Sequence, residues 1–297
     1  MGKPFKSGFV ALLGAPNAGK STLLNRLLGE KLSITSPKPQ TTRNRIMGVV
    51  HRDEAQMVIL DLPGIHKASG PLNRHMVQVA MDAAADVDLI LFMVDASRPD
   101  PEAEEMVLEK LAEHKGPVIL VLNKIDLLEK PALLPLLSRW NEAFDFKALL
   151  PVSARTGEQV EELFSCMENA LPEGAALFPE DTLTDLPERF LAAEVVREKV
   201  FRLTGQELPY ATAVTVEAFE EQESPPFIRI SALIHVEKDS QKGILVGSGG
   251  AMIKKIGTQA RRDLESMLGV KVFLSLLVRV ERNWSRSVQA MKRMGYE

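Results

Sequence analysis

A glycine-rich run near the start of the chain, GAPNAGKS at positions 14–21, has clear chemical potential. Glycines let a backbone wrap closely round a ligand, and successive N–H groups at the start of a helix point at phosphate oxygens. The Lys20 ammonium can reach the β- and γ-phosphates of a nucleotide, and the Ser21 hydroxyl can ligate Mg²⁺. A plain glycine-rich turn between a strand and a helix is the competing interpretation. The predicted phosphate-binding residues are Asn17, Ala18, Gly19, Lys20, Ser21 and Thr22.

A second group is DLPG at positions 61–64, directly after the apolar run 57–60. The Asp61 carboxylate can hold the water shell of a magnesium ion, and the Gly64 N–H can approach a γ-phosphate. Aspartate followed by proline and glycine is also ordinary turn chemistry. The phosphate-binding run upstream is what favours the metal interpretation.

A third group, NKID at positions 123–126, follows the apolar run 118–122 and suits recognition of guanine. The Asp126 carboxylate can accept hydrogen bonds from guanine N1 and N2, a pair of donors that adenine does not have. Asn123 can reach guanine O6 and N7 and tie neighbouring loops together, while the stem of Lys124 can cover the base.

Ser153 and Ala154 follow the further apolar run 148–152 and would complete the base pocket with a backbone N–H to guanine O6. Each of these small groups is common on surface loops when taken alone. They arrive in order, each directly after an expected strand. Because open α/β sheets bind ligands at the carboxyl ends of their strands, this order indicates one nucleotide site.

The elements that must hold these groups alternate along the first half of the chain. Short β-branched or aliphatic runs predict buried strands, and the segments between them predict helices. The expected strands are 9–13, 57–60, 89–94, 118–122 and 148–152. The expected helices are 20–28, 71–85, 101–114, 131–144 and 158–170. Such alternation predicts a mostly parallel sheet with helices on both faces.

The pattern breaks around residues 171–187, where three prolines, a glycine and several acidic residues show no clear period. We therefore expect a first domain at 1–172, a linker at 173–187 and a second domain at 188–297. The second domain has the expected order helix 188–203, strands 211–218 and 227–236, helices 241–246 and 251–268, and strand 270–280.

The strand expected at 227–236 alternates aliphatic residues with Arg229, Ser231 and His235. Successive side chains of a strand point to opposite faces, so we expect one buried face and one face in water.

The chain of 297 residues has a formal charge of −4, which is a sum of unlike parts. Residues 1–180 carry 19 basic and 24 acidic groups, residues 181–240 carry 6 and 12, and residues 241–297 carry 11 and 4. The charges of these segments are therefore −5, −6 and +7. A basic end on an acidic protein is a candidate nucleic-acid surface.

Cysteine content and hydropathy exclude other classes of protein. The single cysteine, Cys166, excludes a disulfide framework and a cysteine-rich zinc site. Apolar runs such as 89–94, 118–122 and 272–280 are far too short to span a bilayer. We therefore expect a cytoplasmic protein.

The basic end contains GSGG at positions 247–250, between two expected helices. A glycine turn of this kind lets a nucleic-acid backbone come close, while an adjoining apolar groove takes about four unstacked bases. An ordinary turn between helices is the competing interpretation, and the surrounding basic residues argue against it. The predicted RNA-binding residues are Lys242, Gly247, Ser248, Gly249, Gly250, Ile253, Lys254, Lys255, Arg261 and Arg262.

The nucleotide-binding groups together resemble those of the translation-factor class of GTPases. Pro16 and Asn17, with QTTR at positions 40–43, resemble the TrmE and Era branch of that class. In that branch the second threonine, here Thr42, is the switch-I residue that ligates Mg²⁺ beside the γ-phosphate. The resemblance implies that Lys20, Thr42 and Gly64 act in catalysis. It implies a magnesium site formed by Ser21, Thr42 and Asp61.

Residues 244–257 resemble a KH-domain signature, and the order α-β-β-α-α-β is that of the bacterial, type II form of this fold. A GTPase domain followed by such a module over nearly the whole chain resembles the Era family of bacterial ribosome-assembly GTPases. The resemblance implies an α/β P-loop GTPase domain with a mostly parallel sheet, followed by an α+β type II KH domain.

The same resemblance implies a protein that binds GTP and hydrolyses it slowly to GDP and phosphate. Its RNA partner would be the 3′ region of 16S ribosomal RNA, and its role would be maturation of the small ribosomal subunit. We further expect a monomer in the cytoplasm, with an additional peripheral population at the inner face of the cell membrane.

Two features depart from related patterns, the turn residues Ser248 and Gly249 and the apolar Ile65, while Asn17 has two alternative roles. Many KH loops carry Lys or Arg where this chain has Ser248 and Gly249, so phosphate contacts must come from backbone N–H groups and neighbouring lysines. Ile65 stands where Ras-like enzymes carry a water-orienting glutamine. Era-like proteins also have an apolar residue there, so Ile65 supports the resemblance, but it leaves no obvious side chain for that task. Asn17 either ligates a potassium ion, as its branch implies, or makes a hydrogen bond that stabilises the loop.

Two alternatives to this function belong to other classes. A small-molecule phosphotransferase also uses a phosphate-binding loop, but the guanine-reading residues 123–126 argue against it. A GTPase whose last domain docks a protein or a membrane, in place of RNA, is the other alternative.

Overall fold

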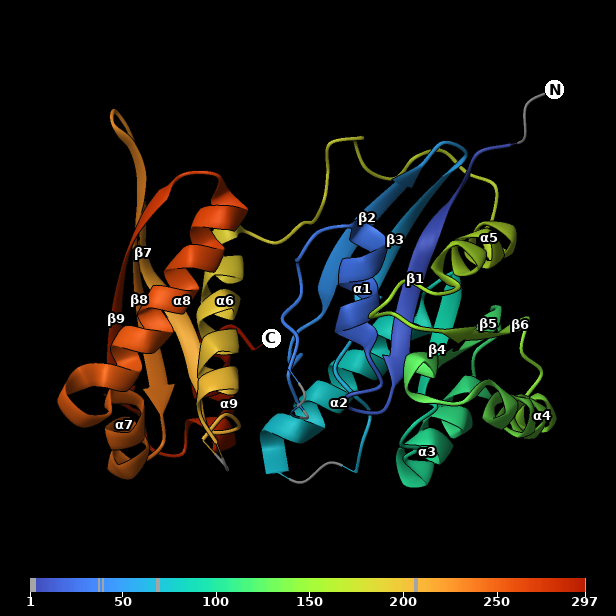
Figure 1. The fold of residues 1–297 in the computed structure, drawn as a ribbon, viewed down its shortest axis with the longest axis horizontal. Helices are drawn as coiled ribbons and strands as arrows, with labels where there is room; N and C mark the ends of the chain where they lie inside the picture. The colour runs from blue at the N-terminus through green and yellow to red at the C-terminus, as the bar shows by residue number, and fades with distance from the viewer. Residues whose placement is uncertain (1–3, 37, 39, 68–69, 206–207, 297) are drawn as a thin grey trace. The chain divides into compact units, whose positions relative to one another are not determined.

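A six-stranded sheet lies at the centre of the first part of the chain, in the order β2-β3-β1-β4-β5-β6 (Figure 1). β2 pairs antiparallel with β3, and the other neighbouring strands pair in parallel. The strands are β1 (Lys6–Gly14), β2 (Ile46–Arg52), β3 (Ala55–Asp61), β4 (Leu89–Asp95), β5 (Val118–Asn123) and β6 (Ala148–Val152). The expected mostly parallel sheet is confirmed.

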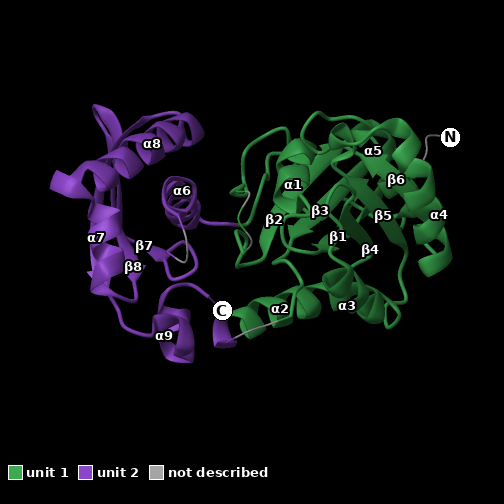
Figure 2. Ribbon diagram, turned by 60° about the horizontal axis from the view of Figure 1, so that its bottom comes forward, with its two compact units in different colours: residues 1–69, 73–185 green, residues 70–72, 186–297 purple. Residues whose placement is uncertain are grey.

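Helices cover both faces of this sheet. They are α1 (Lys20–Leu28), α2 (Gly70–Ala85), α3 (Pro101–Leu111), α4 (Leu133–Ala143) and α5 (Val160–Ala170). Figure 2 shows α1 and α5 on one side of the sheet and α2 and α3 on the other. Strands covered on both faces have almost continuous buried aliphatic runs, as in β5, where all residues are buried.

The computed structural model describes residues 4–36, 38, 40–67, 70–205 and 208–296. It divides into two compact units, coloured separately in Figure 2. The first unit consists of residues 1–69 and 73–185, and the second of residues 70–72 and 186–297.

Strand β2 was not predicted from the sequence. Its seven residues include Gly48 and precede a tight turn into β3, so no long aliphatic run marks it. A Cβ at Gly48 would lie 2.8 Å from a methyl group of Leu28. A larger residue would therefore crowd the packing of Leu28 against the strand, which explains the glycine there. The strand is held by pairing with β3 and by packing against α1.

Residues 173–185, the greater part of the expected linker, are bonded to the first unit. The Gln56 side chain accepts hydrogen bonds from the backbone N–H groups of Leu177 and Phe178, and it donates to the Phe178 carbonyl at 2.7 Å. Further along, the Val49 N–H donates to Leu183 O at 2.8 Å, and the Thr184 hydroxyl donates to Met47 O at 2.6 Å. The segment therefore runs beside the outer edge of β2.

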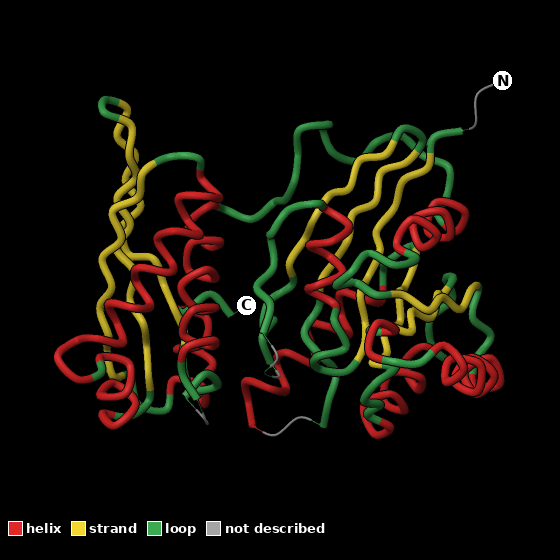
Figure 3. Tube along the Cα trace, viewed as in Figure 1, coloured by secondary structure: helices red, strands yellow, loops and turns green. Residues whose placement is uncertain are grey.

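The second unit is built on a three-stranded sheet in the order β7-β8-β9. Its elements are α6 (Glu188–Leu203), β7 (Ala213–Glu223), β8 (Pro226–Val236), α7 (Asp239–Val246), α8 (Ala251–Leu268), β9 (Lys271–Val280) and α9 (Val288–Arg293). β7 and β8 are antiparallel, whereas β8 and β9 are parallel. Figure 3 shows α6 and α8 running along one face of this sheet.

The core of the second unit lies between those two helices and the sheet. Aliphatic residues of β8, among them Ile230 and Ile234, pack against Val196 of α6 and Ile256 of α8. The observed order of elements up to β9 is the expected α-β-β-α-α-β. The short helix α9, which follows it, was not predicted.

The opposite face of β8 departs from the prediction at one end. Arg229 is exposed as expected, but His235 is only 6% exposed. Its ring contacts the Thr215 hydroxyl at 2.9 Å and the Glu281 carboxylate at 3.2 Å. Glu281 follows β9 and donates its N–H to Val236 O at 2.7 Å, so the chain after β9 covers this end of the strand.

None of the described helices is long and apolar enough to cross a membrane.

Candidate nucleotide site and candidate nucleic-acid interface

The glycine-rich loop connects the end of β1 to the start of α1, as the sequence predicts. Lys20 is buried, and its Nζ donates to the carbonyl oxygens of Gly14 at 3.0 Å and Ala15 at 2.9 Å. Burial lowers the pKa of this lysine to about 8, against the opposing effect of the Asp61 charge. An added phosphate group at the loop would supply the negative charge that stabilises the ammonium.

Oxygen ligands predicted for a magnesium ion converge beside this lysine. The Ser21 hydroxyl lies 2.6 Å from Asp61 Oδ2 and 2.8 Å from the Thr42 hydroxyl. Asp61 is fully buried, and its Oδ1 has no hydrogen-bond partner among the described residues. Burial raises the pKa of the Asp61 carboxyl, while the Ser21 hydrogen bond and the Lys20 charge oppose that effect. A buried, unpartnered carboxylate oxygen beside two hydroxyls fits a hard cation such as Mg²⁺.

Asn123, at the end of β5, ties two loops of the site together. Its Nδ2 donates to Ala18 O at 2.7 Å, and its Oδ1 accepts the Ala154 N–H at 3.0 Å. Gly19 lies against this side chain with φ of +103°, and a Cβ there would be 2.1 Å from Asn123 Nδ2. The loop therefore requires glycine at this position both for its backbone conformation and for space.

Asp126 and its neighbours form the other end of the candidate site. The Ser153 hydroxyl donates to Asp126 Oδ1 at 2.6 Å, and Arg155 pairs with the other carboxylate oxygen. The Ser153 N–H donates to Glu158 O, and the Ala154 N–H donates to Asn123. Contact of one of these N–H groups with guanine O6 remains a prediction.

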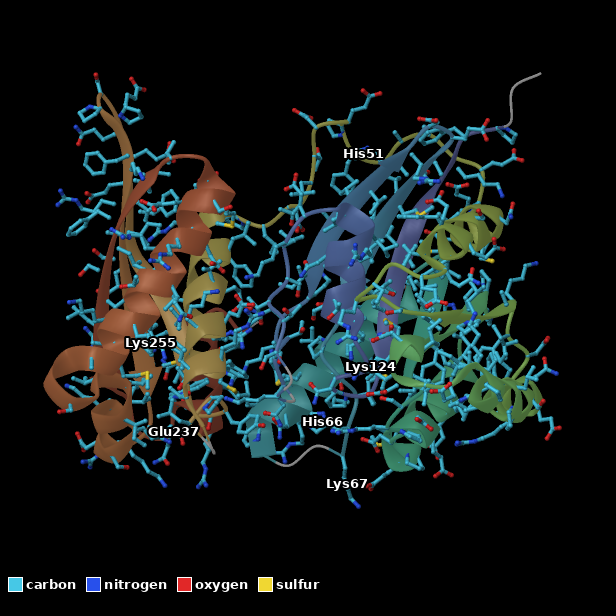
Figure 4. All side chains as sticks on the ribbon, viewed as in Figure 1. His51, His66, Lys67, Lys124, Glu237 and Lys255 are labelled. Carbon is cyan, nitrogen blue, oxygen red and sulfur yellow. The ribbon has the colours of Figure 1, made fainter. Side chains whose placement is uncertain are left out.

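Lys124 has a left-handed backbone, with φ of +67°, and its Nζ pairs with Asp95 Oδ2. Asp95 is the last residue of β4, so this ion pair joins the carboxyl ends of two adjacent parallel strands. Burial raises the pKa of Asp95, but the Lys124 ammonium and the hydrogen bonds from Ser97 together hold that pKa below its ordinary value. Figure 4 shows where Lys124 lies.

The remaining predicted residues also lie on or beside the phosphate loop. Asn17 has φ of +63°, which is uncommon for a residue other than glycine. Thr22 is in the first turn of α1. A Cβ at Gly64 would lie 2.7 Å from Pro16 N and Cα, so the backbone of Gly64 touches the loop.

Three residues that support this site were not predicted. The Ser33 hydroxyl donates to Asp61 Oδ2 at 2.8 Å, and Asn25 accepts the Leu32 and Ser33 N–H groups. Neither Ser33 nor Asn25 has a local pattern that distinguishes it from other polar residues. The third, Asp95, could have been found, because it follows an apolar strand run at the edge where the other candidate residues lie.

The candidate nucleic-acid interface is the turn between α7 and α8. Gly247 has φ of +71°, Gly249 of +57° and Gly250 of +79°. A Cβ at Gly249 or Gly250 would meet nothing within 4 Å, so these glycines leave open space beside the backbone. Ser248 and Gly249 are exposed.

Basic side chains lie on the two helices that flank this turn. Lys242 on α7 and Lys254, Lys255, Arg261 and Arg262 on α8 are all exposed. Ile253 is partly exposed beside them, as an apolar contact for a base requires. The label of Lys255 in Figure 4 marks this part of the second unit.

Two family models match the chain. The model described as 50S ribosome-binding GTPase matches residues 9–124, and that of the KH domain matches residues 207–285. The GTPase Era of Geobacter metallireducens is 52% identical over 293 residues, covering 99% of this chain and 98% of that protein. The GTPase Era of Geobacter sp. strain M21 is 54% identical over 296 residues, with 99% of each chain covered.

Solved structures of Era proteins match over almost the whole length. One is Era in complex with MgGDPNP and nucleotides 1506–1542 of 16S ribosomal RNA, and another is a single-residue variant of Aquifex aeolicus Era bound to GDP·AlF₄⁻. Each has a TM-score of 0.95 and 41% sequence identity, covering 98% of this chain and 99% of the other.

Proposed function

This chain belongs to the Era family of GTPases, and we propose that it binds the 3′ region of 16S ribosomal RNA in the course of small-subunit maturation. The chain is a GTP hydrolase with a P-loop GTPase domain and a C-terminal KH domain. The observation that supports RNA binding best is the open GSGG turn with its exposed basic side chains. A relative of matching fold over 98% of the chain binds nucleotides 1506–1542 of that RNA.

In this proposal the nucleotide lies along the carboxyl ends of the parallel strands. Backbone N–H groups of residues 17–22 and the Lys20 ammonium hold the phosphates, and Asp126 reads guanine beside Asn123, Lys124, Ser153 and Ala154. The short contacts of Asn123 to Ala18 and Ala154 support this arrangement, because they fix the phosphate loop and the base loop relative to one another.

Mg²⁺ would be held by Ser21, Thr42 and Asp61. The buried Asp61 Oδ1, which has no hydrogen-bond partner among the described residues, supports this assignment. When bound, the ion neutralises charge on the β- and γ-phosphates. Lys20 and the loop N–H groups stabilise the charge that develops as the terminal phosphate leaves. These groups position the nucleotide phosphates and neutralise their charge. Without a further contact that activates the reaction, hydrolysis is slow.

Thr42 and Gly64 would report which nucleotide is bound, because each can contact a γ-phosphate only before hydrolysis. The described residues of segments 33–45 and 65–74 would then order or relax with the nucleotide state; residues 37, 39, 68 and 69 lie outside the described part of the chain. A potassium ion on Asn17 would add positive charge beside the phosphates. Equal hydrolysis rates in sodium and in potassium buffers would contradict that part of the proposal.

We also propose that the chain acts as a monomer in the cytoplasm, with a peripheral population at the inner face of the cell membrane. Light scattering of the purified protein tests the first statement. Cell fractionation with and without ribosome depletion tests the second.

A pair of glycine variants tests the RNA-binding function. Gly250 and Gly269 flank α8 at its two ends, both have positive φ, and a Cβ at either meets nothing within 4 Å. Gly250→Asp should lose affinity for an RNA of nucleotides 1506–1542 at least tenfold in the presence of MgGDPNP, whereas Gly269→Asp should bind as the unchanged chain does. Nucleotide affinity should be the same in both variants.

Equal RNA affinity for Gly250→Asp and the unchanged chain would contradict the proposal. Vesicles of anionic lipid and an acidic protein partner serve as competing ligands in the same assay. Binding of either one that Gly250→Asp abolishes, without RNA binding, would favour the docking alternative.

A further inference from the structure

The segment after Gly64 lies directly on the phosphate loop. The Ile65 N–H donates to Gly14 O at 3.1 Å, and the same carbonyl accepts a hydrogen bond from Lys20 Nζ at 3.0 Å. Gly64 itself touches Pro16 through its backbone. The Ile65 N–H and the Lys20 ammonium, which is proposed to hold the γ-phosphate, therefore share one acceptor, the Gly14 carbonyl.

Ile65 cannot take part in proton or water chemistry. Its side chain is apolar and fully buried in the core between sheet and helices. This burial fixes the backbone on either side of it, so the next residue begins from a defined position.

That next residue, His66, has a ring whose orientation is determined by a hydrogen bond. Its Nδ1 lies 2.9 Å from Gly64 O. A carbonyl oxygen only accepts hydrogen bonds, so Nδ1 carries a proton and donates it in this contact. In the neutral imidazole, Nε2 then has an unprotonated lone pair that can accept a hydrogen bond.

The Nε2 atom of His66 is buried and has no hydrogen-bond partner among the residues that the structure describes. Leaving such an atom unpaired away from water is costly. A water molecule with an O–H directed at this nitrogen would satisfy it. The segment thus carries an unpartnered acceptor on a ring that is bonded to the Gly64 carbonyl, and the Gly64 backbone touches the phosphate loop.

The neighbouring Lys67 differs from His66 both in its exposure and in having a partner for its polar group. Its side chain is exposed and pairs with Glu102 at 3.2 Å. Figure 4 shows Lys67 at the margin of the structure, beyond His66. It provides a matched control, because a change there alters the same segment without touching the acceptor.

We propose that His66 positions the attacking water for GTP hydrolysis, through a hydrogen bond from that water to Nε2. The role rests on the GTP hydrolysis stated above, and it fills the position that Ile65 leaves without a polar side chain. The water oxygen bonds to the γ-phosphorus, and the bond from that phosphorus to the β–γ bridging oxygen breaks. The electron pair stays on GDP, and the second water proton passes to a phosphate oxygen, so that GDP and H₂PO₄⁻ leave.

Single-turnover hydrolysis of MgGTP by the full chain tests this role. His66→Ala should hydrolyse GTP at least tenfold more slowly, while its affinity for MgGDPNP changes less than twofold. His66→Gln should recover part of the rate, because its amide oxygen also accepts a hydrogen bond. Lys67→Ala should match the unchanged chain in both measurements.

An unchanged rate in His66→Ala would overturn the role of His66. So would a loss of MgGDPNP affinity as large as the loss of rate, because that result would indicate a structural role for the side chain. The proposed RNA function is measured separately, by binding of nucleotides 1506–1542 to the unchanged chain, so failure of one does not imitate failure of the other.

Discussion

At the nucleotide site Gly19 and Gly64 are crowded, whereas at the GSGG turn of the second unit Gly249 and Gly250 are open and only Gly247 is crowded, by Met252. Gly19 has a side-chain amide within 2.1 Å of where its Cβ would be, but Gly250 has no neighbouring atom within 4 Å. Both have positive φ, at +103° and +79°. The first site is therefore constrained by the protein's own atoms, and the second leaves its space to a ligand.

The polar groups of the two sites differ in the same way. Asp61, Asn123 and Lys20 are buried and bonded within the protein. Lys254 and Lys255 are exposed on α8. A substitution at the first site should change folding and ligand binding together, and one at the second should change binding alone.

Gly19→Ala should give the largest effect. The added methyl group must displace Asn123, which holds two loops, so nucleotide affinity should fall by about 100-fold or more, equivalent to about 2.7 kcal/mol. Fluorescent GDP titration measures it. Gly29→Ala, at the other end of α1 with φ of +73° and no atom within 4 Å of its Cβ, should keep full affinity.

Asn123→Ala should reduce both stability and nucleotide affinity. The change leaves the Ala18 carbonyl and the Ala154 N–H without their partner. We expect a loss of about 2–4 kcal/mol in the free energy of unfolding, because each buried unpaired group costs about 1–3 kcal/mol. Urea denaturation measures it, and a loss below about 0.5 kcal/mol would contradict the account of a tie between loops.

Exchange of Lys254 and Lys255 for glutamine should affect only RNA binding. Each lysine that no longer neutralises a phosphate of single-stranded RNA should flatten the plot of log affinity against log salt by about 0.7. The double variant should therefore lower the slope by about 1.4 and leave GDP affinity and thermal stability unchanged. Lys271→Gln, at the exposed start of β9, is the control. An unchanged slope in the double variant would remove these lysines from the interface.

Much of the nucleotide site could be predicted from the sequence, because its residues come directly after successive strands along the chain. Ser21 and Asp61 were expected to meet since each follows a strand of one parallel sheet, and the structure brings their oxygens to 2.6 Å. The element order of the second unit up to β9 followed from periodic apolar residues. Family resemblance added Thr42, whose position no spacing rule would give.

Other features depended on contacts between distant residues. β2 lacks a long aliphatic run and forms by pairing with β3, and Ser33 reaches Asp61 only because Asn25 holds the loop before it. His235 was expected to face water, but the segment that follows β9 covers it. Alternation along a strand cannot report what a later segment places over it.

His235 gives the smallest expected effect. Burial lowers the pKa of this histidine, although Glu281 and Glu217 oppose that effect and Arg279 adds to it. A folded-state pKa below the unfolded value means that the unfolded chain takes up more protons near pH 6. The free energy of unfolding should therefore decrease as the pH falls from about 7 to about 5.5. His235→Gln should show a smaller decrease in urea titrations at these pH values, and an equal decrease would contradict the assignment.

The bonded segment 173–185 has a consequence for how copies of this protein meet one another. β2 is an edge strand, and an exposed edge invites pairing with another chain and aggregation. The outward backbone groups Met47 O and Val49 N–H are already engaged by Thr184 and Leu183, and the His51 ring contacts the Thr182 carbonyl. The stretch that joins the two units thus also closes one border of the sheet against intermolecular β-pairing.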